Sequence, residues 1–86
     1  MLDLKFSRQS RKFLNKLNSK DWNSVVSRIE LLRKDPFPKG FRRVEGKKDR
    51  TFRVRIGEYR VLYLVFKDRN LLFISIIDKR PSVYDK

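Results

Sequence analysis

The chain has 86 residues and a formal net charge of +13, from 23 lysines and arginines against 10 acidic residues. The length predicts one domain, and the charge predicts a polyanionic partner. Nucleic acid is the first candidate, followed by an acidic protein or an anionic membrane. The sequence holds no cysteine and no histidine, which excludes disulfides and the usual zinc sites, so we expect neither a metal nor a cofactor. No apolar run approaches the roughly 18–20 residues that span a bilayer, and no signal-peptide pattern follows Met1, so we expect a cytoplasmic protein that does not enter membranes.

The first third of the chain predicts a short strand over residues 2–6 and then a helical hairpin. Ser7 offers an N-cap for the first helix, whose outer side carries basic residues, and we expect two of them, Arg11 and Lys12, to contact RNA. A second helix follows a break at residues 18–21 and ends at Asp35, before a proline. Its apolar face is expected to comprise Trp22, Val25, Val26, Ile29 and Leu32.

Residues 37–50 predict an irregular loop, and loops of this length are commonly functional or partly mobile. Glu45 and Asp49 are its only acids. We expect its basic residues to bind RNA, namely Arg42, Arg43, Lys47, Lys48 and Arg50.

The last third predicts strands over residues 51–56, 59–66 and 71–78. Gly57 begins a two-residue turn of type II′ between the first two strands. The later strands are apolar on both faces, which places them in the middle of a sheet. We therefore expect an α+β fold, in which the N-terminal strand and the helical hairpin pack on a small antiparallel sheet.

The predicted hairpin sets Arg55 directly across from Arg60, with Arg53 on the same face. Like charges placed opposite each other on a sheet repel, and a multiply charged anion bound between them would reverse that cost. The alternative is a solvated strand face with Glu58 or Asp78 as the partner. The sequence leaves both interpretations open.

The tail adds an arginine, Arg80, and a phenol four residues later, Tyr84. Tyr84 is either a packing residue or a group that stacks on a base and exchanges a proton. Cleavage of RNA beside a 2′-hydroxyl needs proton transfer in both directions and stabilisation of the extra phosphate charge. Arginine and tyrosine are weak acid–base catalysts, so such an enzyme would depend on a larger macromolecule to position the substrate.

The run from Thr51 to Tyr63, preceded by Val44-Glu45-Gly46, resembles the central signature of the RelE/ParE superfamily of toxins. The tail from Lys79-Arg80 to Tyr84 resembles the terminal arginine and tyrosine motif of that family. The order of elements matches too, so the resemblance covers essentially the whole chain. It implies a single RelE-like toxin domain over residues 1–86.

The RelE-like branch consists of metal-independent endoribonucleases that enter the ribosomal A site and cut messenger RNA, which inhibits translation. The 2′-hydroxyl attacks the adjacent phosphate and a cyclic phosphate is left. By position, Arg53 and Arg55 match residues that contact phosphate, and Arg60 matches the arginine that holds the scissile phosphate. Arg80 matches a residue that assists the leaving group, and Tyr84 matches the tyrosine that stacks on the nucleotide.

The resemblance has departures and also implies a partner. Some members carry lysine where this chain has Arg53 and Arg55, and because arginine is not a general base, the identity of the base stays open and more of the proton transfer depends on Tyr84. We expect no extra C-terminal helix of the kind that some relatives have, so the second sheet face would be apolar until an antitoxin covers it. The implied partner is an acidic RelB-like antitoxin that wraps the toxin, covers this face and neutralises part of the charge.

Three other interpretations stay open. A ParE-like toxin would share the fold and inhibit DNA gyrase without cutting RNA. A non-catalytic, basic nucleic-acid-binding module would not depend on Tyr84 or Arg60 beyond binding. The third interpretation is a toxin that has lost its activity.

Overall fold

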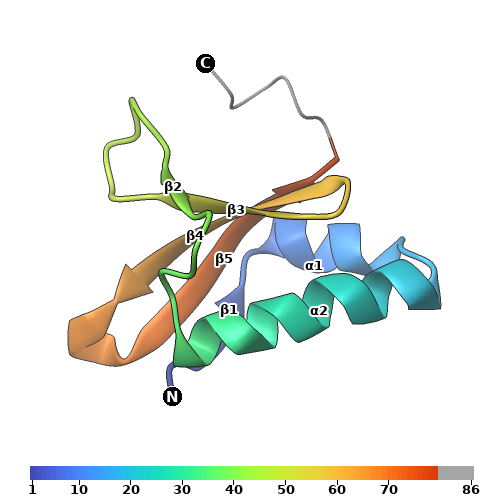
Figure 1. The fold of residues 1–86 in the computed structure, drawn as a ribbon, viewed down its shortest axis with the longest axis horizontal. Coiled ribbons are helices and arrows are strands. Elements are labelled where there is room, and N and C mark those ends of the chain that lie inside the picture. The colour runs from blue at the N-terminus through green and yellow to red at the C-terminus, as the bar shows by residue number, and fades with distance from the viewer. Residues whose placement is uncertain (80–86) are drawn as a thin grey trace.

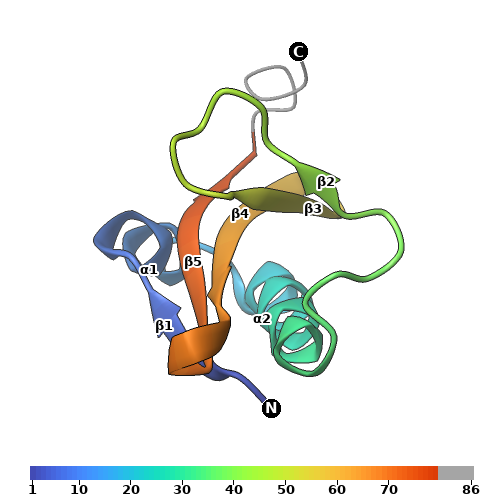
Figure 2. The same ribbon diagram turned by 90° about the vertical axis from the view of Figure 1, so that its left-hand side faces the viewer.

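The computed structural model of the protein describes residues 1–79. In chain order, its elements are β1 (Asp3–Phe6), α1 (Arg8–Asn15), α2 (Ser19–Lys34), β2 (Arg42–Arg43), β3 (Phe52–Ile56), β4 (Tyr59–Phe66), a 3-10 turn η1 (Lys67–Arg69) and β5 (Leu71–Asp78). The strands form one sheet in the order β1-β5-β4-β3-β2, and both helices cover one of its faces (Figures 1 and 2). The predicted α+β class is confirmed. In addition, β1 pairs in parallel with β5, so the sheet is mixed.

Both helices begin at the capping residues that the sequence indicates. The Ser7 hydroxyl accepts a hydrogen bond from the Ser10 N–H at 3.1 Å, and the Asn18 side chain accepts one from the Asp21 N–H at 2.8 Å. These caps satisfy backbone donors that a helix leaves without an internal partner. The second helix ends at Lys34, because Asp35 is extended ahead of Pro36. No helix in residues 1–79 combines the length and apolar character needed to cross a bilayer.

One residue of the expected apolar face lies in a different environment. Val25, Ile29 and Leu32 are buried as predicted, whereas Trp22 is 41% exposed. Trp22 belongs to the first turn of α2, which extends past the β3–β4 hairpin (Figure 1). The expectation that Trp22 belongs to the buried face is therefore wrong, because helical periodicity does not show where the sheet ends beneath the helix.

The loop expected between residues 37 and 50 contains a strand that the sequence analysis missed. Arg42 pairs with Arg53 and Arg43 with Phe52, which places β2 at the edge of the sheet. Phe37 holds this segment in place, because its ring centroid lies 5.0 Å from that of Phe52. Two consecutive arginines show no alternation of apolar and polar residues, so the pattern did not indicate a strand.

The predicted β3–β4 hairpin is confirmed to the residue. Ile56 pairs with Tyr59 and Arg55 with Arg60. Gly57 has a φ of +61°, as the first central position of a type II′ turn requires. This register fixes which side chains share each face of the sheet.

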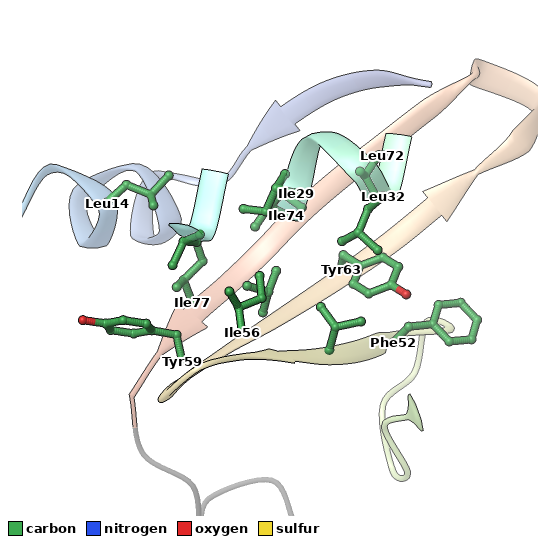
Figure 3. Packing of buried hydrophobic residues seen from close by; sticks show 13 residues of the cluster. Leu14, Ile29, Leu32, Phe52, Ile56, Tyr59, Tyr63, Leu72, Ile74 and Ile77 are labelled. Atoms are coloured by element: carbon green, nitrogen blue, oxygen red, sulfur yellow. The ribbon is translucent and has the colours of Figure 1, made fainter. Parts of the chain in front are cut away.

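The hydrophobic core lies between the helices and one face of the sheet (Figure 3). Leu14, Ile29 and Leu32 approach from the helices, and Ile56 and Tyr63 meet them from β3 and β4. Successive side chains of a strand point to opposite faces, so every second residue of β3 and β4 points away from this core. We call the other side of the sheet the open face.

The N-terminal segment is bound to β5, which is far away in sequence. Besides the parallel pairing of β1, the Ser7 hydroxyl donates to the Ser75 carbonyl at 2.7 Å. The Gln9 side chain donates to the Ile77 carbonyl at 2.9 Å and accepts from the Ile77 N–H at 3.0 Å. The first nine residues are therefore held by the last strand of the sheet.

Candidate nucleic-acid site on the open face

Three arginines from the hairpin share the open face, and we call them the arginine cluster: Arg53, Arg55 and Arg60. Their neighbours Val54 and Ile56 are buried in the core, so the alternation of β3 turns Arg53 and Arg55 away from the helices. Arg60 joins them because it pairs directly with Arg55. The predicted juxtaposition of these three residues is confirmed by the register.

Arg60 occupies the centre of the cluster and is only 1% exposed. It lies in register between Arg55 on β3 and Asp78 on β5. Desolvation by burial, followed by the charges of Arg55 and Arg53, lowers the pKa of Arg60 below its usual value, while Asp78 acts in the opposite direction. The structure thus contains both features weighed from the sequence, a crowd of like charges and one acidic neighbour.

Two hollows adjoin at the cluster. One, of about 270 Å³, is lined by Arg55, Gly57, Glu58, Arg60 and Lys79. The other, of about 290 Å³, is lined by Gly40, Arg42, Arg53 and Arg55. Arg55 lines both, and each hollow is bordered by at least two guanidinium groups, which suit phosphate groups. The Lys79 Nζ atom lies 3.7 Å from Glu58 Oε2. This ion pair joins exposed side chains and therefore contributes little to the stability of the fold.

The residues expected to bind RNA fall into separate groups. Arg42 joins the cluster through its pairing with Arg53, and Arg43 follows it on the exposed edge strand. Lys47 and Lys48 line a hollow of about 430 Å³ on the open face. Arg50 lies over the Phe52 ring, with its Cζ atom 5.9 Å from the ring centroid.

The two helical residues predicted to contact RNA, Arg11 and Lys12, do not belong to this surface. Arg11 and Lys12 are exposed on α1, which covers the opposite face of the sheet (Figure 2). The arginine cluster and this pair therefore belong to different sides of the molecule.

Two of the predicted catalytic residues, Arg80 and Tyr84, lie outside the described residues. The two described tyrosines of β4 belong to the helix side of the sheet. Tyr59 donates to Asp21 Oδ2 at 2.7 Å, and this bond, then burial, raises the pKa of Tyr59. Tyr63 donates to the Pro36 carbonyl, and burial, then Asp35, raises its pKa. Both phenols hold their protons, so they act as structural donors.

Sequence reasoning missed the place of Arg42 and Lys79 at the cluster. Arg42 arrives through β2, which carries no pattern, and Lys79 arrives because β5 ends with Asp78 opposite Arg60. The register that brings Asp78 there shifts between Leu62 and Tyr63, and an alternation pattern does not reveal such a shift. Within residues 1–79, no three acidic side chains gather where they could hold a metal ion.

Comparison with known proteins gives a consistent set of relatives, although no family model matches the sequence. RelE1 of Methanocaldococcus jannaschii, a protein named as a toxin, is 39% identical over 59 residues, which are 65% of this chain and 64% of RelE1. The matched region is thus less than two thirds of that relative's length.

Two solved structures share the fold over nearly the whole chain. The archaeal RelE–RelB complex from Pyrococcus horikoshii OT3 has a TM-score of 0.80 and 24% identity, covering 95% of this chain and 98% of that one. The toxin–antitoxin complex RelBE2 from Mycobacterium tuberculosis has a TM-score of 0.79 and 25% identity, covering 92% of this chain and 91% of that one.

Proposed function

We propose that this chain is a RelE-like member of the RelE/ParE superfamily and the toxin of a toxin–antitoxin pair, because it is similar to RelE1 over 59 residues and shares the fold of RelE toxins. We further propose that it cleaves messenger RNA on the ribosome and thereby inhibits translation. The observation that carries this proposal is the buried Arg60 held beside Arg55 on the open face. Folding alone does not favour this arrangement, and a phosphodiester placed among the guanidinium groups would stabilise it.

In the proposed reaction, the 2′-hydroxyl of the nucleotide attacks the adjacent phosphorus. Its proton is removed, a cyclic phosphate forms, and the 5′-oxygen leaves with a proton. Arg53, Arg55 and Arg60 bind the phosphate and stabilise the charge that develops on its oxygens. The proton transfers are assigned to Tyr84, with Arg80 assisting the leaving group.

This reaction depends on a second macromolecule to position the substrate. Arginine does not act as a general base, and the tyrosines of β4 are engaged elsewhere. An enzyme with so few acid–base groups gains rate mainly from orientation of the reacting atoms. The ribosome would supply that orientation by presenting the codon in a fixed geometry.

The proposed antitoxin is an acidic, RelB-like segment that covers the open face. Lys47 and Lys48 rim a hollow there whose floor includes Leu64, Phe73 and Ile76. This combination suits a helix or strand with apolar residues on one side and carboxylates on the other. We expect association to be fast and to weaken as salt is added.

The site assignment is tested with purified toxin variants on programmed ribosomes. Arg60→Ala is expected to lower the cleavage rate by about 100-fold or more, as removal of one donor from a developing oxyanion does. Primer extension on the messenger RNA measures cuts within the presented codon. Arg69→Ala, in the exposed turn η1, is the matched control and is expected to cleave at the wild-type rate.

Circular dichroism and antitoxin binding verify that the Arg60→Ala protein is folded. Full cleavage by this variant would contradict the assignment. Replication arrest and loss of gyrase supercoiling, with intact messenger RNA, would identify a ParE-like inhibitor instead.

A further inference from the structure

A second cavity lies at the far end of the same strand from the arginine cluster. We call it the aromatic cavity; it measures about 380 Å³ and is lined by Phe37, Arg50, Phe52, Val65, Phe66, Lys67 and Asp68. Arg60 and Phe66 are six positions apart on β4, which corresponds to about 20 Å. The aromatic cavity is therefore separate from the hollows around the cluster.

The walls of this cavity are built from rings that come from three parts of the chain. Phe37 follows α2, Phe52 begins β3 and Phe66 ends β4. The rings of Phe37 and Phe52 pack nearly edge to face, with an interplanar angle of 72°. Phe37 and Phe66 are only partly buried, and Phe66 also borders the hollow that Lys47 and Lys48 line. Exposed ring surface beside a cavity is suited to stacking with another flat group.

The cavity also offers cations. The guanidinium of Arg50 lies over the Phe52 ring and forms a second flat surface at the cavity wall. Lys67 adds a second positive charge, against the single carboxylate of Asp68. Cations beside aromatic rings are the combination that proteins use to hold a base together with its phosphate.

The third component is a stretch of strand edge. β3 pairs with β4 only as far as Phe52, opposite Tyr63, so no described strand pairs with Leu64–Phe66 on that side. Val65 and Phe66 line the cavity along this stretch. Backbone N–H and C=O groups at such an edge can bond to the polar edge of a base.

From these three components, we propose that the aromatic cavity binds one nucleotide of single-stranded RNA, with its base among the rings and its phosphate on Arg50 and Lys67. An apolar side chain of a protein partner would use the rings alone and would leave both cations without a role. A nucleotide uses the rings, the cations and the strand edge together. The site goes beyond the proposed cleavage, because it requires none of the residues of the arginine cluster.

The test is a titration of the ¹⁵N-labelled full-length chain with adenosine 5′-monophosphate and, separately, with ribose 5-phosphate. We expect the complete nucleotide to shift the amide signals of residues 50–52 and 65–68, and ribose 5-phosphate to bind there at least tenfold more weakly. Phe66→Ala is expected to weaken the nucleotide about tenfold, as loss of one stacking surface does. Phe66→Leu, which keeps an apolar side chain, is expected to weaken it similarly and controls for lost packing. Trp22→Ala, which removes an exposed aromatic ring on α2 outside the cavity, is the matched control with unchanged affinity.

The possible outcomes separate this site from the cleavage site. Arg60→Ala should leave the shifts at residues 65–68 in place even where it abolishes messenger cleavage. Equal binding of ribose 5-phosphate would overturn the proposal, as would full affinity in folded Phe66→Leu protein. Displacement of the nucleotide from residues 65–68 by an apolar, uncharged peptide that binds more tightly would assign the cavity to a protein partner and would equally overturn it.

Discussion

Replacement of Arg60 by methionine together with Asp78 by asparagine is expected to stabilise the fold and to remove its affinity for anions. Arg60 has Arg55 on one side and Asp78 on the other. At the separations of paired strands, repulsion by Arg55 destabilises the fold and attraction by Asp78 stabilises it, each by about 1–3 kcal/mol. These contributions largely cancel, which leaves the cost of burying the charge. The lowered pKa of Arg60 has the same sign, because it means that folding disfavours the charged form.

Methionine keeps the buried aliphatic stem and removes the charge. For the double variant Arg60→Met with Asp78→Asn, which removes both charges, we expect a gain of about 1 kcal/mol, which for a chain of this size raises Tm by about 4–8 °C. Arg60→Met leaves Asp78 without Arg60 beside it, so Arg60→Met with Asp78→Asn is expected to be more stable than the single variant.

Urea unfolding in sodium chloride and in sodium phosphate at equal ionic strength measures both properties. Phosphate at ten times its dissociation constant should stabilise the wild type by about 1.4 kcal/mol and leave Arg60→Met unchanged. An Arg60→Met, Asp78→Asn variant less stable than the wild type in chloride would refute the reasoning. It would mean that Arg60 serves the fold, and the main argument for a substrate phosphate at this position would be lost.

Two further predictions concern other contacts. The folded-state pKa of Tyr59 and of Tyr63 is raised, so their contribution to stability is complete below pH of about 10 and is lost as the pH rises further. In urea unfolding between pH 8 and 11, Tyr59→Phe should therefore lose stability less steeply above pH 10 than the wild type; an equal slope would contradict the role of the Asp21 bond. Ser7→Ala removes the α1 cap and the bond to the Ser75 carbonyl, and should lower the free energy of unfolding by about 1–2 kcal/mol, whereas a value near zero would mean that water replaces both bonds.

The parts of the fold that the sequence predicted are those set by local rules. Ser7 and Asn18 begin helices because their side chains satisfy nearby backbone donors. Gly57 sets the hairpin register because its positive φ favours one kind of turn, and that register brings Arg55 and Arg60 together. The candidate site was predictable to this extent because it is built within one hairpin.

The missed features depend on contacts between distant segments. The strand β2 exists because Phe37 and Phe41 pack on Phe52, and no pattern within residues 37–43 indicates that contact. The burial of Arg60 could not be predicted, since an arginine in a strand reads as a surface residue. The aromatic cavity was missed for the same reason, because Phe37 and Phe66 come together only through the tertiary fold.

The attachment of the N-terminal segment to β5 has a consequence for the order in which the protein matures. During synthesis, β1 and α1 emerge first, but the strand that holds them is made after every other element they contact in the sheet. A nascent chain that lacks β5 therefore lacks the strand to which Ser7 and Gln9 bond, and it has no neighbour for Arg60 on the β5 side. For a protein proposed to damage the translation machinery, this delay means that the ribosome finishes making the whole sheet before the arginine site can assemble.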